Sequence, residues 1–585
     1  MIFSWRVGGF KSIGAETELR LAPLTLLCGA NSSGKSSLLQ SILLLSQSAS
    51  ARVGQDPVLL NGSRVQLGDF RDVSHRQATK RVHVGVDLEV QRSAPGEESL
   101  PATLPLWTDV APEDPSSLRA AFDVSFGRSR IGDGGPSLIL DLRLAVDAPD
   151  GQGAVLRVSR RSSGRAPAFN LPSTTSPAVV LGTRDYIIEL NDAFSFDAPV
   201  TSRFFAGRDD KIMGVELQGM IPTGLWVTFD RVLSAVEQTL ARVLLRPLTP
   251  VSAASALDRI RGEDAGTYVD LFFRQKDVVK LIGPKDAAPS TLETIRALNP
   301  SQRRELVGLV PRFLEHEVQN RPGAALSFAK RPLPQSLAVA AQAIARRAGG
   351  IRRLGPLRQP PQPIYRGSSA ADVADVGEQG EYTASVLHRF ATLPVRYQWD
   401  GAVKEEPLQL AVGRWMRHLG IHSGVVAQEL GNLGHVLGIF DEAVPIAMDL
   451  TQVGVGVSQV LPVLVQALLT PPGGTLLLEQ PELHLHPAVQ SRLADFLVAA
   501  CCEDRQILCE THSEYLVARL RILMAERPEM RGGFLRIYFA ARIGANTQFE
   551  EIRLDDRGRI DNWPRGFFDQ SALDSARMLE MDLAR

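Results

Sequence analysis

Eight residues near the N-terminus, Gly29 to Ser36, combine glycines with a lysine and a serine at a spacing that suits phosphate binding. Their sequence is GANSSGKS. Glycines let the backbone surround anionic oxygens with N–H groups, while Lys35 would neutralise the β- and γ-phosphates of a nucleotide and Ser36 would bind Mg²⁺. The predicted nucleotide-binding residues are Gly29, Ala30, Asn31, Ser32, Ser33, Gly34, Lys35, Ser36 and Ser37.

The residues on either side of this loop predict the elements that must position it. Residues 24–28 form an apolar run with the length of a buried strand, and apolar residues recur at helical spacing over 38–45. A strand, a glycine-rich loop and a helix in this order aim the helix N-terminus at a bound phosphate. We therefore expect an α/β fold with a nucleotide site at its start.

A second apolar strand, far along the chain, ends in acidic residues. Residues 475–482 read TLLLEQPE, so Glu479 follows the apolar run directly. A carboxylate in this position can hold Mg²⁺ opposite Ser36. The sequence therefore predicts that Glu479 is on the metal side of the nucleotide site.

Two further segments place polar groups at the ends of elements. Residues 453–459, VGVGVSQ, open an apolar helix whose N-terminus would favour an anion, with Ser458 as a candidate cap. His512 follows an apolar strand at 506–509, the position expected for a side chain that contacts the γ-phosphate. Both segments are therefore candidate parts of the same site.

The composition limits the class of protein. With 585 residues, the chain exceeds the size of a single hydrophobic core, so two or more lobes are expected. A net charge of −1 gives no overall attraction to nucleic acid or to anionic membranes. The sequence has no apolar run long enough to span a bilayer and no disulfide pattern among its four cysteines. We expect a cytoplasmic protein without membrane contact.

The pattern of apolar residues divides the chain into five expected parts. Residues 1–90 and 351–535 would form one α/β core, and 536–585 a C-terminal extension. A β-rich insertion at 91–225 and a helical insertion at 226–350 would separate the two halves of the core. Helical spacing in the second insertion is clearest at 229–245, 292–297, 301–318 and 337–347.

Four segments occur in one order along the chain: GANSSGKSS, VGVGVSQ, LLLEQPELHLHP and ETHSEYL. Together they resemble the ABC-type ATPase heads of the SMC/RecF and OLD-like families, in the branch of compact bacterial AAA ATPases without a long coiled coil. The stretch from Ile537 to Phe568 looks like the uncharacterised domain that ends many of these proteins. The resemblance implies an ABC-type P-loop ATPase core, split by a long insertion, that binds ATP and Mg²⁺ as a homodimer or higher oligomer.

The resemblance also implies a role for individual residues. Residues 29–37 would be the Walker A loop, Glu479 the Walker B acid and His512 the switch histidine. Gln66 is a candidate for the Q-loop, joining Ser36 and Glu479 at the metal. The signature motif, which contacts ATP held by the opposite subunit, would comprise Gly454, Gly456, Ser458 and Gln459.

The end of the Walker B segment departs from the family pattern. Those families usually have Asp followed by Glu, whereas this chain has Glu479 followed by Gln480. An amide cannot accept a proton as a carboxylate can. Either Glu482 substitutes as the base, or turnover is slow. The predicted catalytic set is Glu479, Gln480, Glu482 and His512.

Three functions remain open at this point. The first is an ATPase that regulates a separate effector protein in bacterial anti-phage defence, which suits a chain without the acidic metal cluster of an appended nuclease. The second is a RecF-like DNA-binding repair or maintenance ATPase, with phosphate contacts from a basic segment. The third is an ATP-locked structural scaffold. The basic segment contains Arg346, Arg347, Arg352, Arg353 and Arg358.

Overall fold

The computed structural model describes most of the chain. The described ranges are 1–51, 56–77, 80–90, 118–128, 137–147, 153–161, 179–182, 185–192, 211–230, 271–282, 326–365, 374–441 and 444–568, together with isolated residues between 231 and 313 and after 568. The helices predicted at 229–245, 292–297 and 301–318 lie mostly outside these residues.

The chain divides into two compact units. The first unit combines residues 1–142 with residues 342–585, and the second contains residues 143–341. One core built from both ends of the chain, with a long insertion between them, is the predicted arrangement. The predicted insertion began at 91, but β5 (Leu118–Gly127) pairs with β4 (Arg81–Val90) along its whole length and so belongs to the first unit.

A six-stranded sheet forms the centre of the first unit. Adjacent strands run parallel, except that the last two pair antiparallel. The three central parallel strands β19, β20 and β3 are buried along almost their whole length, as expected for a parallel sheet covered on both faces. In order across the sheet they are β13 (Arg352–Leu354), β19 (Thr475–Glu479), β20 (Gln506–Glu510), β3 (Leu24–Gly29), β21 (Leu535–Ile543) and β22 (Asn546–Ile552).

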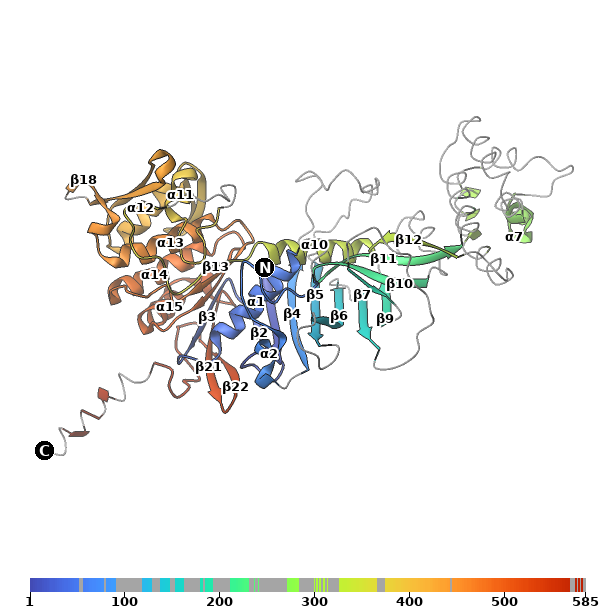
Figure 1. Ribbon diagram of the computed structural model, residues 1–585, viewed down its shortest axis with the longest axis horizontal. Helices are drawn as coiled ribbons and strands as arrows, with labels where there is room; N and C mark the ends of the chain where they lie inside the picture. Colours follow the sequence, from blue (N-terminus) through green and yellow to red (C-terminus); the bar gives the residue numbers. More distant parts are fainter. Residues whose placement is uncertain are drawn as a thin grey trace. The chain divides into compact units, whose positions relative to one another are not determined.

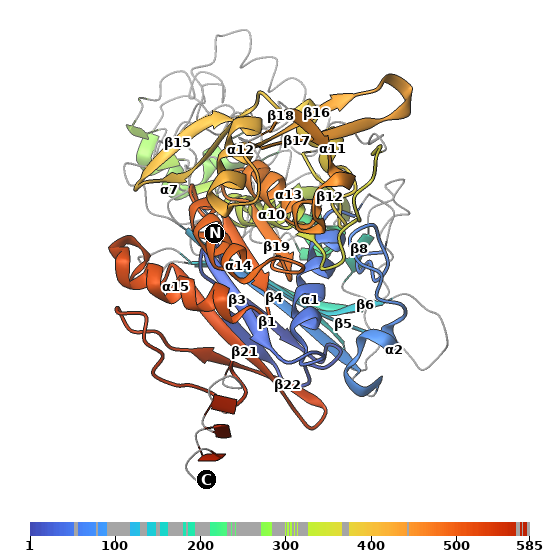
Figure 2. The same ribbon diagram turned by 90° about the vertical axis from the view of Figure 1, so that its left-hand side faces the viewer.

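Helices from distant parts of the sequence pack with this sheet (Figures 1 and 2). Side chains of three of them share one hydrophobic cluster with the strands. The expectations of helices after the loop, before the Walker B strand and after it are confirmed. The helices are α1 (Lys35–Ala49), α13 (Val455–Leu469), α14 (Pro487–Ala500) and α15 (Glu514–Glu526).

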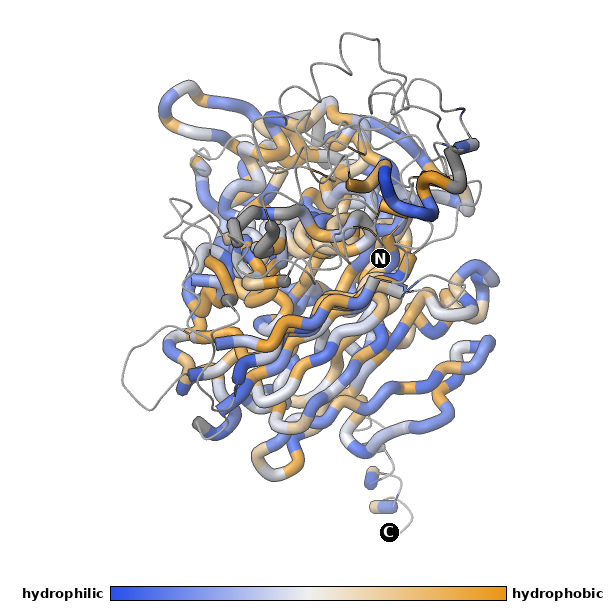
Figure 3. Tube along the Cα trace, turned by 90° about the vertical axis from the view of Figure 1, so that its right-hand side faces the viewer, coloured by the Kyte–Doolittle hydropathy of each residue, from blue (hydrophilic) through white to orange (hydrophobic). Residues whose placement is uncertain are grey.

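An antiparallel sheet also belongs to the first unit. Strand β1 (Ile2–Gly8) pairs with β2 (Thr17–Arg20) on one side and with β4 on the other, and β4 continues to β5. Alternation in β1 buries Trp5 and Val7 completely. Hydrophobic and hydrophilic residues alternate along many of the strands drawn in Figure 3, which is typical of sheets with one face on a core.

A group of smaller elements lies between β13 and α13 in the sequence. It contains one hairpin, a three-stranded antiparallel sheet and two helices, and it leads into the signature segment. The elements are α11 (Thr383–Arg389), β14 (Pro394–Trp399), β15 (Ala402–Pro407), α12 (Leu408–Leu419), β16 (Gly424–Glu429), β17 (His435–Asp441) and β18 (Val444–Asp449). A short helix, α2 (Phe70–Val73), precedes β4.

The second unit is rich in strands. Strand β6 (Leu138–Asp147) and helix α10 (Gln335–Gly349) each span a boundary between the units. The remaining elements of the second unit are the antiparallel pair β7 (Gly153–Arg160) and β9 (Tyr186–Asp192), a sheet of β12 (Leu326–Pro332), β11 (Ile221–Asp230), β10 (Lys211–Gln218) and β8 (Val179–Gly182), and helix α7 (Lys276–Ile282).

Among the described residues, no helix is long and apolar enough to cross a membrane.

Candidate nucleotide-binding site

The phosphate-binding loop joins the end of β3 at Gly29 to the start of α1 at Lys35. Two of its glycines have left-handed backbone angles, with φ of 138° at Gly29 and 103° at Gly34. A Cβ at Gly29 would lie 2.3 Å from the carbonyl oxygen of Ala540, and one at Gly34 would lie 2.1 Å from Oγ1 of Thr547. Both positions therefore require glycine on conformational and steric grounds.

The C-terminal strand pair supports this loop from outside. Oγ1 of Thr547, on β22, donates to the carbonyl oxygen of Ser33 at 2.8 Å and lies 2.8 Å from the hydroxyl of Ser12. The Thr547 side chain is buried, so these hydrogen bonds do not compete with water. The segment predicted as a C-terminal extension is thus part of the central sheet and contacts the loop.

Lys35 and Glu510 form the charged centre of the site. The ammonium of Lys35 donates to the carbonyl oxygens of Gly29 at 3.1 Å and Ala30 at 2.8 Å, and lies 3.8 Å from Oε1 of Glu510. The hydroxyl of Ser36 donates to Oε2 of Glu510 at 3.1 Å. Burial lowers the pKa of Lys35 and raises the pKa of Glu510, while their ion pair opposes both shifts.

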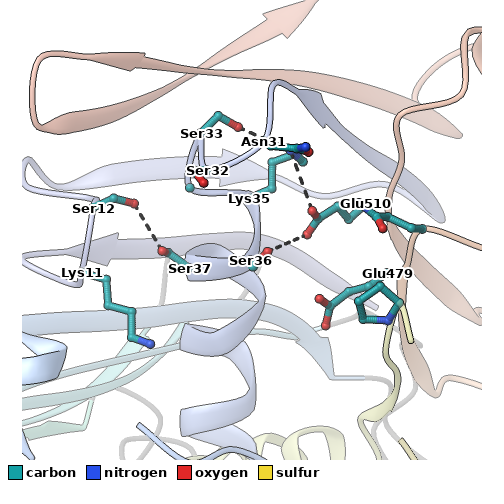
Figure 4. A pocket seen from close by; sticks show the side chains of 13 residues that line it. Lys11, Ser12, Asn31, Ser32, Ser33, Lys35, Ser36, Ser37, Glu479 and Glu510 are labelled. Atoms are coloured by element: carbon teal, nitrogen blue, oxygen red, sulfur yellow. Dashed lines mark hydrogen bonds and ion pairs between the residues drawn. The ribbon is translucent and has the colours of Figure 1, made fainter. Parts of the chain in front are cut away.

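These groups line a cavity of about 380 Å³ (Figure 4). Figure 4 shows the side chain of Glu510 between Lys35 and Ser36, with Glu479 on the same side of the loop. Most predicted residues of the loop, together with Glu479 and Gln480, are therefore brought together. The full lining is Lys11, Ser12, Asn31, Ser32, Ser33, Gly34, Lys35, Ser36, Ser37, Pro356, Glu479, Gln480 and Glu510.

Sequence reasoning missed Glu510, although a signal for it was present. Glu510 is the last residue of β20, which lies between β19 and β3. The carboxyl ends of parallel strands meet at one edge of a sheet, where α/β proteins bind their ligands. An acidic residue directly after the predicted strand at 506–509 was therefore a candidate for the same edge as Glu479.

Two arginines hold the end of the Walker B strand. Nε of Arg353 lies 2.7 Å from Oε1 of Glu479. Arg358 is buried and donates to the carbonyl oxygens of Glu479 at 2.9 Å and Gln480 at 3.3 Å. Burial lowers the pKa of Arg358 to about 10. These contacts fix both the backbone and the carboxylate of Glu479.

The predicted DNA-contact cluster does not form one free basic face. Arg353 also pairs with Glu378 at 3.1 Å, and Arg352 pairs with Asp375 at 3.4 Å. Arg346 is exposed, whereas Arg347 is partly buried. Arg352 and Arg353 thus have acidic partners that lie close in space but are distant in sequence, and DNA contact by this segment stays a prediction.

Gln480 and Glu482 occupy different environments. Gln480 has a left-handed backbone with φ of 46°, and its N–H donates to the carbonyl of Glu510 at 2.8 Å. Oε1 of Glu482 accepts a hydrogen bond from the backbone N–H of His512 at 2.7 Å, and burial raises the pKa of this carboxyl. Glu482 is absent from the cavity lining among the described residues, so it anchors the loop that contains His512.

The ring of His512 is only partly buried, yet its Nε2 is shielded from solvent. This atom has no hydrogen-bond partner among the described residues. Burial, and then the charge of Lys35, lowers the pKa of His512 and favours its neutral form. The neutral ring next to the lysine can therefore still gain a hydrogen-bond partner.

The signature segment begins helix α13. Its N-cap is Gly454, so the expectation that Ser458 caps the helix is wrong. Ser458 is buried one turn later and donates to the carbonyl of Val455 at 2.7 Å. Gly454 and Val455 are exposed, and Gln459 is buried. The surface of this segment is therefore the helix N-terminus itself, with Gly456 beside the carbonyl of His484.

Gln66 lies apart from the other predicted metal ligands. It forms an isolated bridge with Asn61, and its side-chain amide donates to the carbonyl of Gly62 at 2.6 Å. Gln66 does not line the cavity around Lys35 and Ser36. The described contacts of Gln66 are therefore with this turn and not with the residues around the cavity.

Comparisons with known proteins agree with this core. Residues 445–518 match a family described as AAA domain, putative AbiEii toxin, Type IV TA system. Residues 535–578 match a family described as protein of unknown function (DUF3696). No curated protein matches the chain significantly.

Solved structures similar to the chain include SMC head domains. One, from Pyrococcus furiosus and bound to the C-terminal domain of ScpA, has 10% identity, covers 100% of this chain and 99% of its own, and gives a TM-score of 0.29. A second, from Thermotoga maritima, has 8% identity, covers 94% and 99%, and gives 0.30. A third, from Pyrococcus yayanosii, has 11% identity, covers 98% and 99%, and gives 0.30.

The chain contains an α/β core with a P-loop, and part of this core, residues 445–518, matches an AAA domain family. The AAA family match covers the predicted signature, Glu479 and His512, and the parallel sheet brings the carboxyl ends of β19, β20 and β3 to the cavity edge. The predicted resemblance and the predicted fold class, an α/β core split by a long insertion, are confirmed.

Proposed function

We propose that this chain is a cytoplasmic ATP-binding, slowly hydrolysing ATPase that dimerises around ATP and regulates a partner protein. The observation that carries the nucleotide part is the cavity itself. It joins the N-terminus of α1, the ammonium of Lys35 and two buried carboxylates, Glu479 and Glu510. A triphosphate complements the helix terminus and the lysine, while the carboxylates require a cation.

The oxygen ligands in the cavity suit Mg²⁺. Hydroxyl and carboxylate oxygens are its preferred protein ligands, usually with several waters and substrate phosphates completing the shell. Ser36 and Glu510 are already hydrogen-bonded to each other, and Glu479 lines the same cavity. Bound Mg²⁺ would neutralise charge on the phosphates. We assign Ser36, Glu510 and Glu479 to this role, and no described contact supports adding Gln66.

Slow hydrolysis follows from the groups available to activate water. Gln480 lines the cavity, but its amide cannot take a proton. Glu482 does not line the cavity, and its Oε1 accepts the hydrogen bond from the His512 backbone. Glu479 is paired with Arg353, which favours its role as a charge rather than as a base. ATP therefore acts mainly as a ligand that holds subunits together. His512 does not line the cavity in the ligand-free chain, so its role at the γ-phosphate is proposed from the resemblance to ABC-type heads alone.

Dimerisation is supported by the exposed start of α13. The resemblance to ABC-type heads implies that this helix N-terminus contacts ATP bound to the opposite subunit. Gly454 is exposed, and a Cβ built on it meets no atom within 4 Å. A side chain here can therefore alter a contact between subunits without disturbing the fold of one subunit.

Two substitutions test the proposal. Lys35→Ala should abolish ATP binding, measured by calorimetry, because the phosphates lose their charge partner. Gly454→Glu should leave ATP binding by the single chain intact, yet abolish ATP-dependent dimerisation measured by light scattering, because a carboxylate would face the triphosphate. Gly454→Ser is the matched control and should dimerise. Unchanged ATP binding by Lys35→Ala would refute the nucleotide site, and dimerisation of Gly454→Glu would refute the interface.

The regulatory part rests on the resemblance to OLD-like ATPases, from which we propose a role in bacterial anti-phage defence through a separate effector. The AAA family matched at 445–518 is described as a putative toxin of a Type IV toxin–antitoxin system. Purification with the products of neighbouring genes, with and without ATP, tests this. A neighbour that binds only the ATP-loaded chain supports regulation, and the absence of any ATP-dependent complex with these products argues against it.

A further inference from the structure

A group of two histidines and one glutamate lies on the small elements that precede the signature helix. His388 is in the last turn of α11, Glu429 ends β16, and His435 begins β17. Glu429 and His435 are direct partners in the antiparallel register of the hairpin. One ligand atom from each of the three side chains can be chosen so that all lie within 4.8 Å of one another. Figure 2 shows α11 beside β16 and β17.

We propose that His388, Glu429 and His435 bind a divalent transition-metal ion, with Zn²⁺ as the best match to the ligand set. This site is separate from the nucleotide cavity, whose lining contains none of these residues. Two imidazole nitrogens with one carboxylate favour zinc and its neighbours over Mg²⁺ or Ca²⁺, which prefer oxygen ligands. Three protein ligands also leave a coordination position for water or for a group from another molecule.

The hydrogen bond of His388 prepares this ring for metal binding. Its Nδ1 lies 3.2 Å from the carbonyl oxygen of Ala427. A carbonyl can only accept a hydrogen bond, so Nδ1 carries a proton and, in the neutral ring, Nε2 carries a lone pair. Metal-binding histidines usually have this second hydrogen bond, which fixes the tautomer and the ring orientation.

The distance between His388 and Glu429 also suits a shared cation. Nε2 of His388 lies 3.7 Å from Oε2 of Glu429. This separation is too long for a hydrogen bond. Two ligands of a tetrahedral zinc ion lie about 3.3 Å apart, given metal–ligand distances of about 2.0–2.1 Å. Both side chains are partly exposed, so an ion can reach them from solvent.

His435 completes the group from the other strand. Its ring centroid lies 5.3 Å from that of His388, with the planes tilted by 57°. Its Nδ1 is buried and has no hydrogen-bond partner among the described residues. A metal here would link the end of α11 to the β16–β17 hairpin.

The test uses the untagged full-length chain after chelator treatment, with excess Mg²⁺ to occupy oxygen-ligand sites. Zn²⁺ titration by calorimetry, together with elemental analysis, should give one equivalent per chain. His388→Ala and His435→Ala should each weaken Zn²⁺ binding by roughly tenfold or more, since even losing an outer-shell partner costs 10–100-fold. Glu429→Gln, which keeps the side-chain shape, should also weaken it.

His418→Ala is the matched control. His418 is exposed to a similar degree, 35% against 39% for His388, and also lies beside a carboxylate, Asp495 at 3.3 Å, but it has no second histidine in a metal-binding group among the described residues. Its Zn²⁺ binding should equal that of the wild type. ATP binding by every variant verifies the fold. Two results would overturn the proposal. The first is no stoichiometric Zn²⁺ uptake by the wild type, which is expected if His388 and Glu429 form only an ordinary ion pair. The second is Zn²⁺ uptake equal to that of the wild type by the double variant His388→Ala/His435→Ala.

Discussion

The substitution Glu510→Gln separates two effects of the same carboxylate. Without Mg²⁺, Glu510 is an ion-pair partner of Lys35 and a negative charge in the cavity where the triphosphate would bind. With Mg²⁺, the proposal makes it a metal ligand beside Ser36. The amide keeps the size of the side chain and removes its charge. The substitution should therefore change ATP affinity in opposite directions under the two conditions.

The distance between Lys35 and Glu510 sets the size of the effect. At 3.8 Å and an effective dielectric constant of about 20, their attraction is about 4 kcal/mol before desolvation is considered. ATP must replace this attraction and also overcome repulsion from the carboxylate. If a third of the attraction appears in the binding equilibrium, Mg²⁺-free ATP binding should tighten about tenfold, which corresponds to about 1.4 kcal/mol.

Calorimetric titration of ATP in chelator and in excess Mg²⁺ measures both effects. The Glu510→Gln variant should bind ATP more tightly than the wild type in chelator and more weakly in Mg²⁺. Glu479→Gln is the control, because Glu479 pairs with Arg353 instead of Lys35 and should change Mg²⁺-free affinity little. Equal or weaker binding by Glu510→Gln in chelator would refute the competition, and unchanged binding in Mg²⁺ would refute the metal role.

Three further substitutions test other contacts. Gln480→Glu should raise steady-state ATP turnover by about 10²-fold if a missing base limits hydrolysis, and an unchanged rate would contradict this. Thr547→Val should lower the free energy of unfolding by about 1 kcal/mol and weaken ATP binding, whereas unaltered ATP affinity would mean that the loop needs no support from β22. Asp495→Asn should lower the free energy of unfolding by about 1–3 kcal/mol at pH 7, because buried Asp495 pairs with Arg519 and His418. Burial alone would raise the pKa of Asp495, but hydrogen bonds from His418 and Arg519 hold this pKa below that of an ordinary aspartate. The stabilisation should therefore be present above the pKa of an unfolded aspartate and disappear as the pH falls through the folded pKa. Chemical denaturation across this pH range should show the stability of the wild type approaching that of the variant, and a constant difference would contradict the assignment.

The parts of the site that were predicted are those whose chemistry lies in contiguous residues. A glycine-rich loop between an apolar strand and a helix fixes its own backbone, so its residue types alone identify a phosphate-binding shape. Glu479 was found because it follows an apolar strand directly. In each case a short segment contains both the functional group and the element that positions it.

The parts that were missed or misjudged depend on partners distant in sequence. Arg353 looked like one member of a basic cluster, yet it pairs with Glu479, which lies on the neighbouring parallel strand. The C-terminal segment looked like an appendage, yet β21 pairs with β3 along the strand that enters the loop. Neither pairing has a local sequence signature, because main-chain hydrogen bonds between strands are formed by almost any residue.

The role of Glu510 shows how strand order changes the interpretation of a residue. At the end of an isolated strand, a glutamate is most simply a solvated boundary residue. Once β20 is placed between β19 and β3, the same residue must lie beside the helix N-terminus that begins at Lys35. It is then a buried charge that needs a cation, which Lys35 supplies in the ligand-free chain and Mg²⁺ would supply with ATP. The sheet order, rather than the glutamate itself, makes this carboxylate part of the nucleotide site.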